Sequence, residues 1–226
     1  MHVVVAPDKF KGSLSAAEVA ARVAAGLAEA APSATVVRVP VADGGEGTLA
    51  AALAAGFDRV PVRVAGPTGA PLETALAVRG RTAVIEMATA SGLAALPDGA
   101  PAPLTATSLG TGQLVRAALD RNCTEVVLGI GGSACTDGGA GLLTGLGARL
   151  ADAAGRDLPP GGGCLPELHR VDLTGLDPRL RSARVVLATD VDNRCSAPAG
   201  RPPSTARRRA PRLRTSSCSR PAWPAG

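Results

Sequence analysis

The sequence has 226 residues, of which 46% are apolar, and this is enough for one large domain with a buried core. Its net charge of +5 arises at one end, because eight of the 24 basic residues and none of the 19 acidic residues follow Asn193. The preceding residues are mildly acidic, which argues against a nucleic-acid partner. Five widely spaced cysteines do not predict a disulfide framework. The first residues resemble neither a signal peptide nor a membrane span, so we expect a cytoplasmic protein without a membrane partner.

The first 88 residues begin with two strand–helix pairs and continue with three strands. The pairs are predicted at 2–7 with 15–32 and at 34–42 with 46–56. Ser15 and Glu18 form an S-x-x-E capping box, which predicts the start of the first helix. Turn residues separate the three strands, which are predicted at 58–66, 72–80 and 82–88.

The chain then returns to an alternation of helix and strand. Helices are predicted at 111–122 and 139–150, and strands at 124–130 and 183–189. This alternation predicts an α/β fold with a doubly wound parallel sheet. The three consecutive strands interrupt the pattern. We therefore assign 1–57 with 105–193 to the main domain, and 58–104 to the β-rich part of a second, smaller α/β domain.

Polar clusters follow four of the predicted strands. The ligands of doubly wound sheets bind beyond the carboxyl ends of the strands, so these clusters are expected to line one cleft. In chain order they are Asp8, Lys9, Lys11 and Ser13; Asp43, Glu46 and Thr48; Ser133, Thr136 and Asp137; and Asp190, Asp192 and Asn193.

A glycine-rich stretch, GIGGSACTDGGAG, follows the strand at 124–130 and precedes a helix. Glycines let the backbone approach a ligand closely, and successive N–H groups before a helix suit a phosphate. We predict a phosphate or nucleotide site in this stretch, with Asp137 holding a metal ion or a hydroxyl group. The alternative is a tight strand–helix turn with close helix packing. No G-K-[ST] follows, so this is not a Walker A loop. The predicted ligands are Gly131, Gly132, Ser133, Asp137 and Gly138.

The other clusters also have structural alternatives. Asp43 and Glu46 flank two glycines, but they could also be an acidic N-cap of a short helix. Ser108 precedes a helix in SLGTGQL, which alone is a weak signal. Lys9 and Lys11 are the only lysines beside 22 arginines. They indicate a required ammonium group, although a solvated loop would also explain them.

Together these clusters favour phosphoryl transfer. That reaction needs amides, an ammonium group and Mg²⁺ to stabilise charge, and a carboxylate to accept a hydroxyl proton. The alternative is a non-catalytic phosphate- or nucleotide-binding protein whose basic tail binds nucleic acid. The surplus of carboxylates argues against a pure anion site.

Five stretches resemble, in order and spacing, the bacterial glycerate kinase family. They are VVVAPDKFKGSLSAAEVA, PVADGGEGT, SLGTGQLVRAAL, GIGGSACTDGGAG and DVDN. The resemblance runs from Met1 to about Asn193, with small departures at Leu109, Cys135–Thr136 and Thr189. It implies a flavodoxin-like α/β domain, a second α/β domain and an active site in the cleft between them. It also implies phosphorylation of D-glycerate with ATP and Mg²⁺, giving 2- or 3-phosphoglycerate.

The resemblance also implies roles for individual residues. Lys11 and the amides of 131–133 would hold phosphate, and Asp190 would be the base on the glycerate hydroxyl. Mg²⁺ would bind Asp43 or Asp137. The catalytic residues would be Asp8, Lys11 and Asp190, and the substrate-binding residues would be Asp43, Glu46, Ser108 and Asn193.

Residues 194–226 differ in character from the rest of the chain. They hold eight arginines, six prolines and no apolar periodicity, so we expect disorder. If one base has been lost just after the Asn193 codon, putting it back restores a frame that can read GPQKGA and then an amphipathic helix, as the family has there. We therefore expect an out-of-frame tail on an incomplete, inactive kinase. A functional basic arm is the alternative, and the sequence indicates no oligomeric state.

Overall fold

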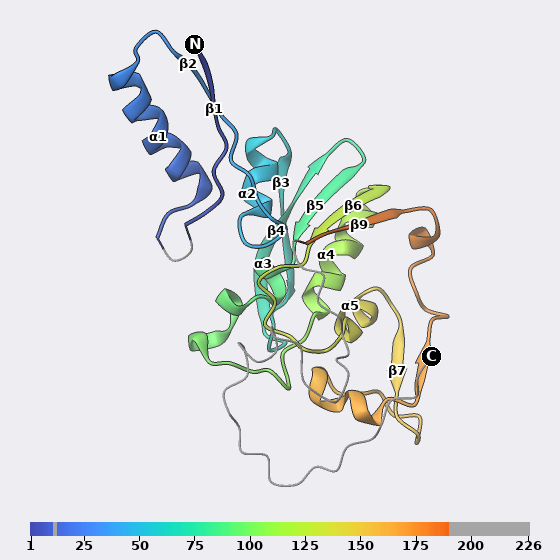
Figure 1. The fold of residues 1–226 in the computed structure, drawn as a ribbon. Coiled ribbons are helices and arrows are strands. Elements are labelled where there is room, and N and C mark those ends of the chain that lie inside the picture. Colours follow the sequence, from blue (N-terminus) through green and yellow to red (C-terminus); the bar gives the residue numbers. More distant parts are fainter. Residues whose placement is uncertain (11–12, 190–226) are drawn as a thin grey trace, which may run out of the picture.

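The computed structural model describes residues 1–10 and 13–189. Their strands form a two-stranded parallel sheet, a mixed five-stranded sheet and a two-stranded antiparallel sheet (Figure 1). The strands are β1 (His2–Val5), β2 (Thr35–Arg38), β3 (Asp58–Ala65), β4 (Pro71–Arg79), β5 (Thr82–Glu86), β6 (Glu125–Gly129), β7 (Arg149–Ala151), β8 (Arg170–Asp172) and β9 (Arg184–Ala188). The α-helices are α1 (Ala16–Ala30), α2 (Thr48–Ala54), α3 (Ala88–Ser91), α4 (Leu109–Asp120) and α5 (Ala140–Gly145). Short 3₁₀ helices span Leu93–Ala95, Pro97–Gly99, Gly162–Glu167 and Pro178–Arg181.

The five-stranded sheet has the order β3-β4-β5-β6-β9. Its β5, β6 and β9 are parallel, and β3 and β4 continue it as an antiparallel hairpin at one edge. The predicted α/β class with a parallel-rich sheet is confirmed. β5 pairs with β6 in parallel, although the sequence prediction placed these two strands in different domains, with a boundary at residue 104. The β3–β4 hairpin thus extends a parallel sheet and does not start a separate one. The division into domains itself stays a prediction.

Both faces of this sheet are covered. On one face α4 packs its Leu114 and Val115 against Ile85 and Val126, in a cluster of fully buried side chains. On the other face Leu49 and Ala52 of α2 pack against Ala75, Ala77 and Val84. Neighbouring residues of β4 and β5 thus point to opposite sides, as the pleat of a strand requires. The two layers fix the loops at the carboxyl ends of β5 and β6.

The first two strands form a separate unit with α1. β1 and β2 pair in parallel, and the ribbon of this unit extends away from the five-stranded sheet (Figure 1). The predicted capping box is confirmed, because Ser15 Oγ accepts from Glu18 N at 3.3 Å and Glu18 Oε2 accepts from Ser15 N at 2.8 Å. Val4 and Val37 remain 65% and 48% exposed.

Some elements differ from the sequence prediction. The helix expected to reach residue 150 ends at Gly145, because Gly147 has a φ of 102° and turns the chain into β7. β7 pairs with β8 in antiparallel orientation, and neither this pair of strands nor α3 was predicted. Within residues 1–10 and 13–189, no helix has both the length and the apolar character to cross a membrane.

Candidate active site

The loop 43–47, between β2 and α2, lies against the ends of β6 and β9. Gly44 O accepts a hydrogen bond from Gly131 N at 2.9 Å. A Cβ on Gly44 would lie 2.3 Å from Ala188 O, and one on Gly131 would lie 2.6 Å from Gly45 Cα. Only glycines permit such backbone contacts. The glycines of ADGGEG and of the glycine-rich loop are therefore needed to bring these two loops together.

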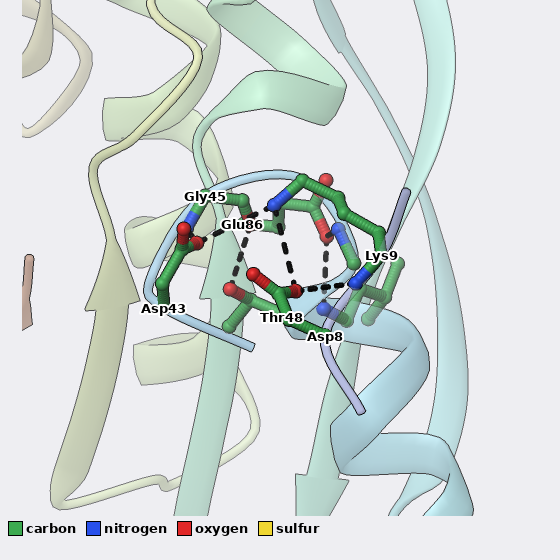
Figure 2. Close-up of polar contacts among 8 residues, drawn as sticks. Asp8, Lys9, Asp43, Gly45, Thr48 and Glu86 are labelled. Carbon is green, nitrogen blue, oxygen red and sulfur yellow. Dashed lines mark hydrogen bonds and ion pairs between the residues drawn. The ribbon is translucent and has the colours of Figure 1, made fainter. Parts of the chain in front are cut away.

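Lys9 joins the loop after β1 to the loop after β2. Its Nζ lies 3.4 Å from Asp43 Oδ1 and 3.8 Å from Asp8 Oδ1, and its side chain is only 13% exposed (Figure 2). The N–H of Gly45, which donates to Asp43 Oδ1 at 2.9 Å, and the Lys9 ammonium hold the pKa of Asp43 below its ordinary value. The carboxylates that we predicted at two strand ends thus share one ammonium group.

Glu86, the last residue of β5, anchors the same loop to the five-stranded sheet. It is 6% exposed, and its Oε2 accepts from Gly47 N at 3.1 Å and Leu49 N at 2.9 Å (Figure 2). Thr48 Oγ1 closes the turn by donating to Gly45 O at 2.7 Å. Burial raises the pKa of Glu86, and the two N–H donors only partly offset that rise.

A pocket of about 360 Å³ opens beside this loop, between the start of α1 and α2. Asp8, Lys9 and Glu46 form its polar end. A Cβ on Gly132 would lie 3.4 Å from Glu46 Oε1, so Glu46 faces both the pocket and the glycine-rich loop. The rest of the lining is largely apolar and includes Leu14, Val41, Ala50, Ala51 and Ala54.

Asp137 lies in a second cluster, with Ser108. It is 2% exposed and accepts from Ser108 N at 2.8 Å, from Ser108 Oγ at 2.9 Å, and from the N–H groups of Gly139 and Gly141 at 3.1 Å. Thr107 Oγ1 adds a longer contact at 3.4 Å. Ser108 Oγ also accepts from Leu142 N at 2.9 Å. The carboxylate thus ties the start of α4 to the start of α5.

The glycine-rich loop itself is crossed by an antiparallel bridge between Gly92 and Ser133. Leu93 N donates to Gly132 O and Ala134 N to Ser91 O, so the bridge does not use the N–H groups of Gly132 and Ser133. Ser133 Oγ accepts from Cys135 N at 3.2 Å. Of the predicted phosphate-binding amides, that of Gly131 donates to Gly44 O.

The predicted magnesium ligands do not fit a cation site. The oxygens of Asp137 are surrounded by N–H and O–H donors, and Asp43 faces the Lys9 ammonium, whereas Mg²⁺ requires free oxygen ligands in near-octahedral geometry. In the part of the chain that the structure describes, no group of three or more His, Cys, Asp and Glu side chains could hold a metal ion.

The structure brings together most, but not all, of the predicted site. Asp8, Asp43 and Glu46 meet Gly131 and Gly132 at the ends of β6 and β9, whereas Ser108 pairs with Asp137 at the α4–α5 junction. Gly138 lies in the turn before α5, with a φ of 59°. Three predicted residues, Lys11, Asp190 and Asn193, lie outside the described residues.

Glu86 is the residue that the sequence reasoning missed. It is a single acid at the end of an apolar strand, TAVIE, and therefore follows the same strand-end rule that selected the other clusters. The strand 82–88 was assigned to the second domain, whereas the predicted clusters follow strands of the main domain.

A family comparison decides where this chain belongs. The model of the glycerate kinase family matches residues 3–201. The chain belongs to the glycerate kinase family. The match runs past Asn193, where we expected the resemblance to end.

Individual glycerate kinases agree with this assignment. The chain is 46% identical over 203 residues to glycerate kinase of Bacillus subtilis strain 168, covering 88% of this chain and 53% of that protein. It is 48% identical over 197 residues to glycerate 2-kinase of Escherichia coli K12, covering 85% and 51%. The chain therefore spans about half the length of the curated relatives it matches.

A solved structure supports the fold. The chain superposes with a TM-score of 0.77 and 46% identity on a crystal structure of a Salmonella typhimurium LT2 protein assigned as glycerate kinase 2. The similarity covers 87% of this chain and 54% of that one.

Proposed function

We propose that this chain carries part of an active site for the ATP-dependent phosphorylation of D-glycerate. The observation that carries the proposal is the meeting of three strand-end loops in a member of the glycerate kinase family. Lys9 holds Asp8 and Asp43 together, and Gly44 packs on Gly131 of the glycine-rich loop. Carboxylates, an ammonium group and backbone amides are the groups that phosphoryl transfer uses.

The proposed reaction transfers the terminal phosphoryl group of ATP to a hydroxyl oxygen of D-glycerate. A carboxylate accepts the hydroxyl proton, the freed oxygen attacks the terminal phosphorus, and ADP leaves with the electron pair of the broken P–O bond. We assign the base to Asp190 and phosphate binding to Lys11 and the amides of Gly132 and Ser133. Asp8 acts with them as a catalytic residue, and Asp43, Glu46, Ser108 and Asn193 as substrate-binding residues. The described carboxylates do not form a Mg²⁺ site, and no step is assigned to that ion.

The 226-residue chain alone should turn over poorly. It spans about half the length of its relatives, and the wall of the pocket beside Lys9 is built by only two helices and their loops. We propose that the remaining length of such relatives contributes further groups to the cleft. The affinity of the chain for D-glycerate and ATP is therefore a better first test of the proposal than its phosphorylation rate.

The test combines binding with product detection. The purified chain is titrated calorimetrically with D-glycerate and with ATP, and ³¹P NMR identifies any 2- or 3-phosphoglycerate formed, with the Bacillus subtilis relative assayed in parallel. We expect binding of both ligands and a turnover well below that of the relative. Asp43→Asn should weaken D-glycerate binding, while the exposed Asp58→Asn serves as the matched control. Absence of D-glycerate binding, or phosphorylation of a different acceptor, would refute the proposal.

A further inference from the structure

We propose that a second pocket, behind α5, binds the purine base of the nucleotide. This inference rests on the proposed function, because it names where the base of ATP would lie. The pocket has a volume of about 180 Å³ and lies between the starts of α4 and α5 and the segment 158–165. Pockets for whole drug-sized ligands are about 300–1,000 Å³, so this one suits a single ring system.

The chemistry of the lining selects an uncharged, flat group. Of the described residues that line the pocket, none is charged. Glycerate and phosphate are therefore unsuited to it, since a buried anion requires a cation or several donors. The walls are formed mainly by Leu109, Leu150, Leu158, Pro159, Pro160 and Leu165. Aliphatic and proline surfaces of this kind can sandwich a base where aromatic residues are scarce, as they are in this sequence.

The position of the pocket connects it to the glycine-rich loop. Thr107 and Gly141 line the pocket, and both also donate hydrogen bonds to Asp137. The loop that would hold the phosphates therefore ends at the pocket wall. A nucleotide with its base behind α5 would extend its phosphates along this loop. The pocket beside Lys9, with its polar end of Asp8, Lys9 and Glu46, would remain for the acid substrate.

The hydroxyl groups of Thr107 and Thr144 supply polar contacts. Thr144 is exposed at the rim of the pocket, where its Oγ1 donates to Ala140 O at 3.1 Å. Thr107 is buried at 1% exposure. Its hydroxyl donates to Asp137 and its oxygen accepts from Leu109 N at 3.2 Å, which leaves one lone pair for a further donor. A purine amino group is such a donor, which favours adenine over a wholly apolar ring.

Cys164 provides a direct readout, because it lines the pocket and is partly exposed. The intact chain is treated with N-ethylmaleimide, and the labelling rate at Cys164 is followed by peptide mapping. We expect ATP and adenosine to slow the labelling by about tenfold at ten times their dissociation constants, whereas inorganic triphosphate and D-glycerate leave it unchanged. Labelling at Cys135, which is outside the pocket lining, is the internal control for adenosine, because adenosine carries no phosphate for the glycine-rich loop.

A pocket-filling variant provides the second readout. Ala140→Leu should abolish the protection by adenosine, while Ala153→Leu, an exposed alanine outside the lining, should keep it. If Ala140→Leu fails to fold, Thr144→Leu at the exposed rim replaces it, and the wild-type protection data stand without either variant. Protection of Cys164 by triphosphate as strongly as by ATP, or no protection by adenosine, would overturn the proposal.

The outcomes separate this inference from the proposed function. D-glycerate phosphorylation without adenosine protection leaves the function standing and rejects the pocket. Adenosine protection that Ala140→Leu removes, in a chain that binds no D-glycerate, supports the pocket and rejects the function.

Discussion

Asp137 shows how a residue with a predicted ligand role can instead hold the site together. The substitution Asp137→Asn keeps the size of the side chain but replaces one acceptor oxygen with an NH₂ group. That group then faces the donors of Ser108, Gly139 and Gly141. We expect a loss of about 1–3 kcal/mol in the free energy of unfolding, because buried donors lose their acceptor. Urea unfolding measures it. Asp98→Asn, in the exposed 3₁₀ helix Pro97–Gly99, is the matched control, and equal losses in both variants would contradict this role.

Glu86 makes a separate prediction about pH. Burial raises its pKa above the ordinary value of 4.5, so the folded state binds this proton more tightly than the unfolded state. The free energy of unfolding contributed by Glu86 therefore falls as pH rises through the window above 4.5. Glu86→Gln has no such proton to lose.

We expect the stability of Glu86→Gln, relative to wild type, to increase from about pH 4 to about pH 7. Urea unfolding at each pH measures this difference. Glu73→Gln, on an exposed side chain of β4, is the matched control at the same pH values. A flat profile for Glu86→Gln would show that this carboxyl group is not destabilised by burial.

At the residue scale, the sequence predicts positions better than it predicts roles. Asp8, Asp43 and the glycine-rich loop could be placed in one region because all follow strands, and the structure confirms that they meet. The sequence could not show that Lys9 lies between the two carboxylates, because that contact joins residues 34 positions apart. The sequence also could not show that Asp137 is buried, since its burial depends on how α4 and α5 pack.

At the element scale, the packing of α4 on α5 depends on glycine. A Cβ on Gly112 would lie 2.3 Å from Leu142 O, and one on Gly145 would lie 2.7 Å from Leu109 O. Alanine is the better helix former by about 1 kcal/mol, yet Gly112→Ala should lower the free energy of unfolding by about 1–3 kcal/mol through overpacking.

Gly26 of α1 is the matched control, since nothing lies within 4 Å of a Cβ there. Gly26→Ala should leave the urea midpoint unchanged or raise it. If Gly112→Ala behaved like Gly26→Ala, the close approach of α4 and α5 would not be important for stability.

The elements themselves were largely predictable, because apolar alternation and caps are local signals. The start of α1 and the three strands β3 to β5 follow from such patterns, whereas α4 begins at Leu109, two residues before its predicted start. The end of α5 was not predicted correctly, because the sequence continues with helix-forming residues after the glycines at 145 and 147 that end the helix. Strand partners were not predictable either, because 38 residues separate the end of β5 from the start of β6 and their pairing depends on how the intervening chain packs.

At the scale of the whole molecule, stability should be unevenly distributed. The unit of β1, α1 and β2 has a two-stranded sheet, and Ala20 is the single buried residue of α1. In contrast, Ile85 of β5 and Val126 of β6 are fully buried. A two-stranded sheet with little buried apolar surface is marginal in water, so this unit should open without the rest unfolding.

Hydrogen exchange tests this directly. We expect amides of α1 and β1 to exchange about 100-fold faster than those of β6, which corresponds to ~2.7 kcal/mol between local and global opening. Gly26→Ala should slow exchange in α1 up to about fivefold, through its ~1 kcal/mol gain in helix propensity, and leave β6 unchanged. If the variant slowed β6 equally, the two regions would unfold as one. The loop that carries Asp8 and Lys9 would then be held by the global stability of the chain, because it follows β1.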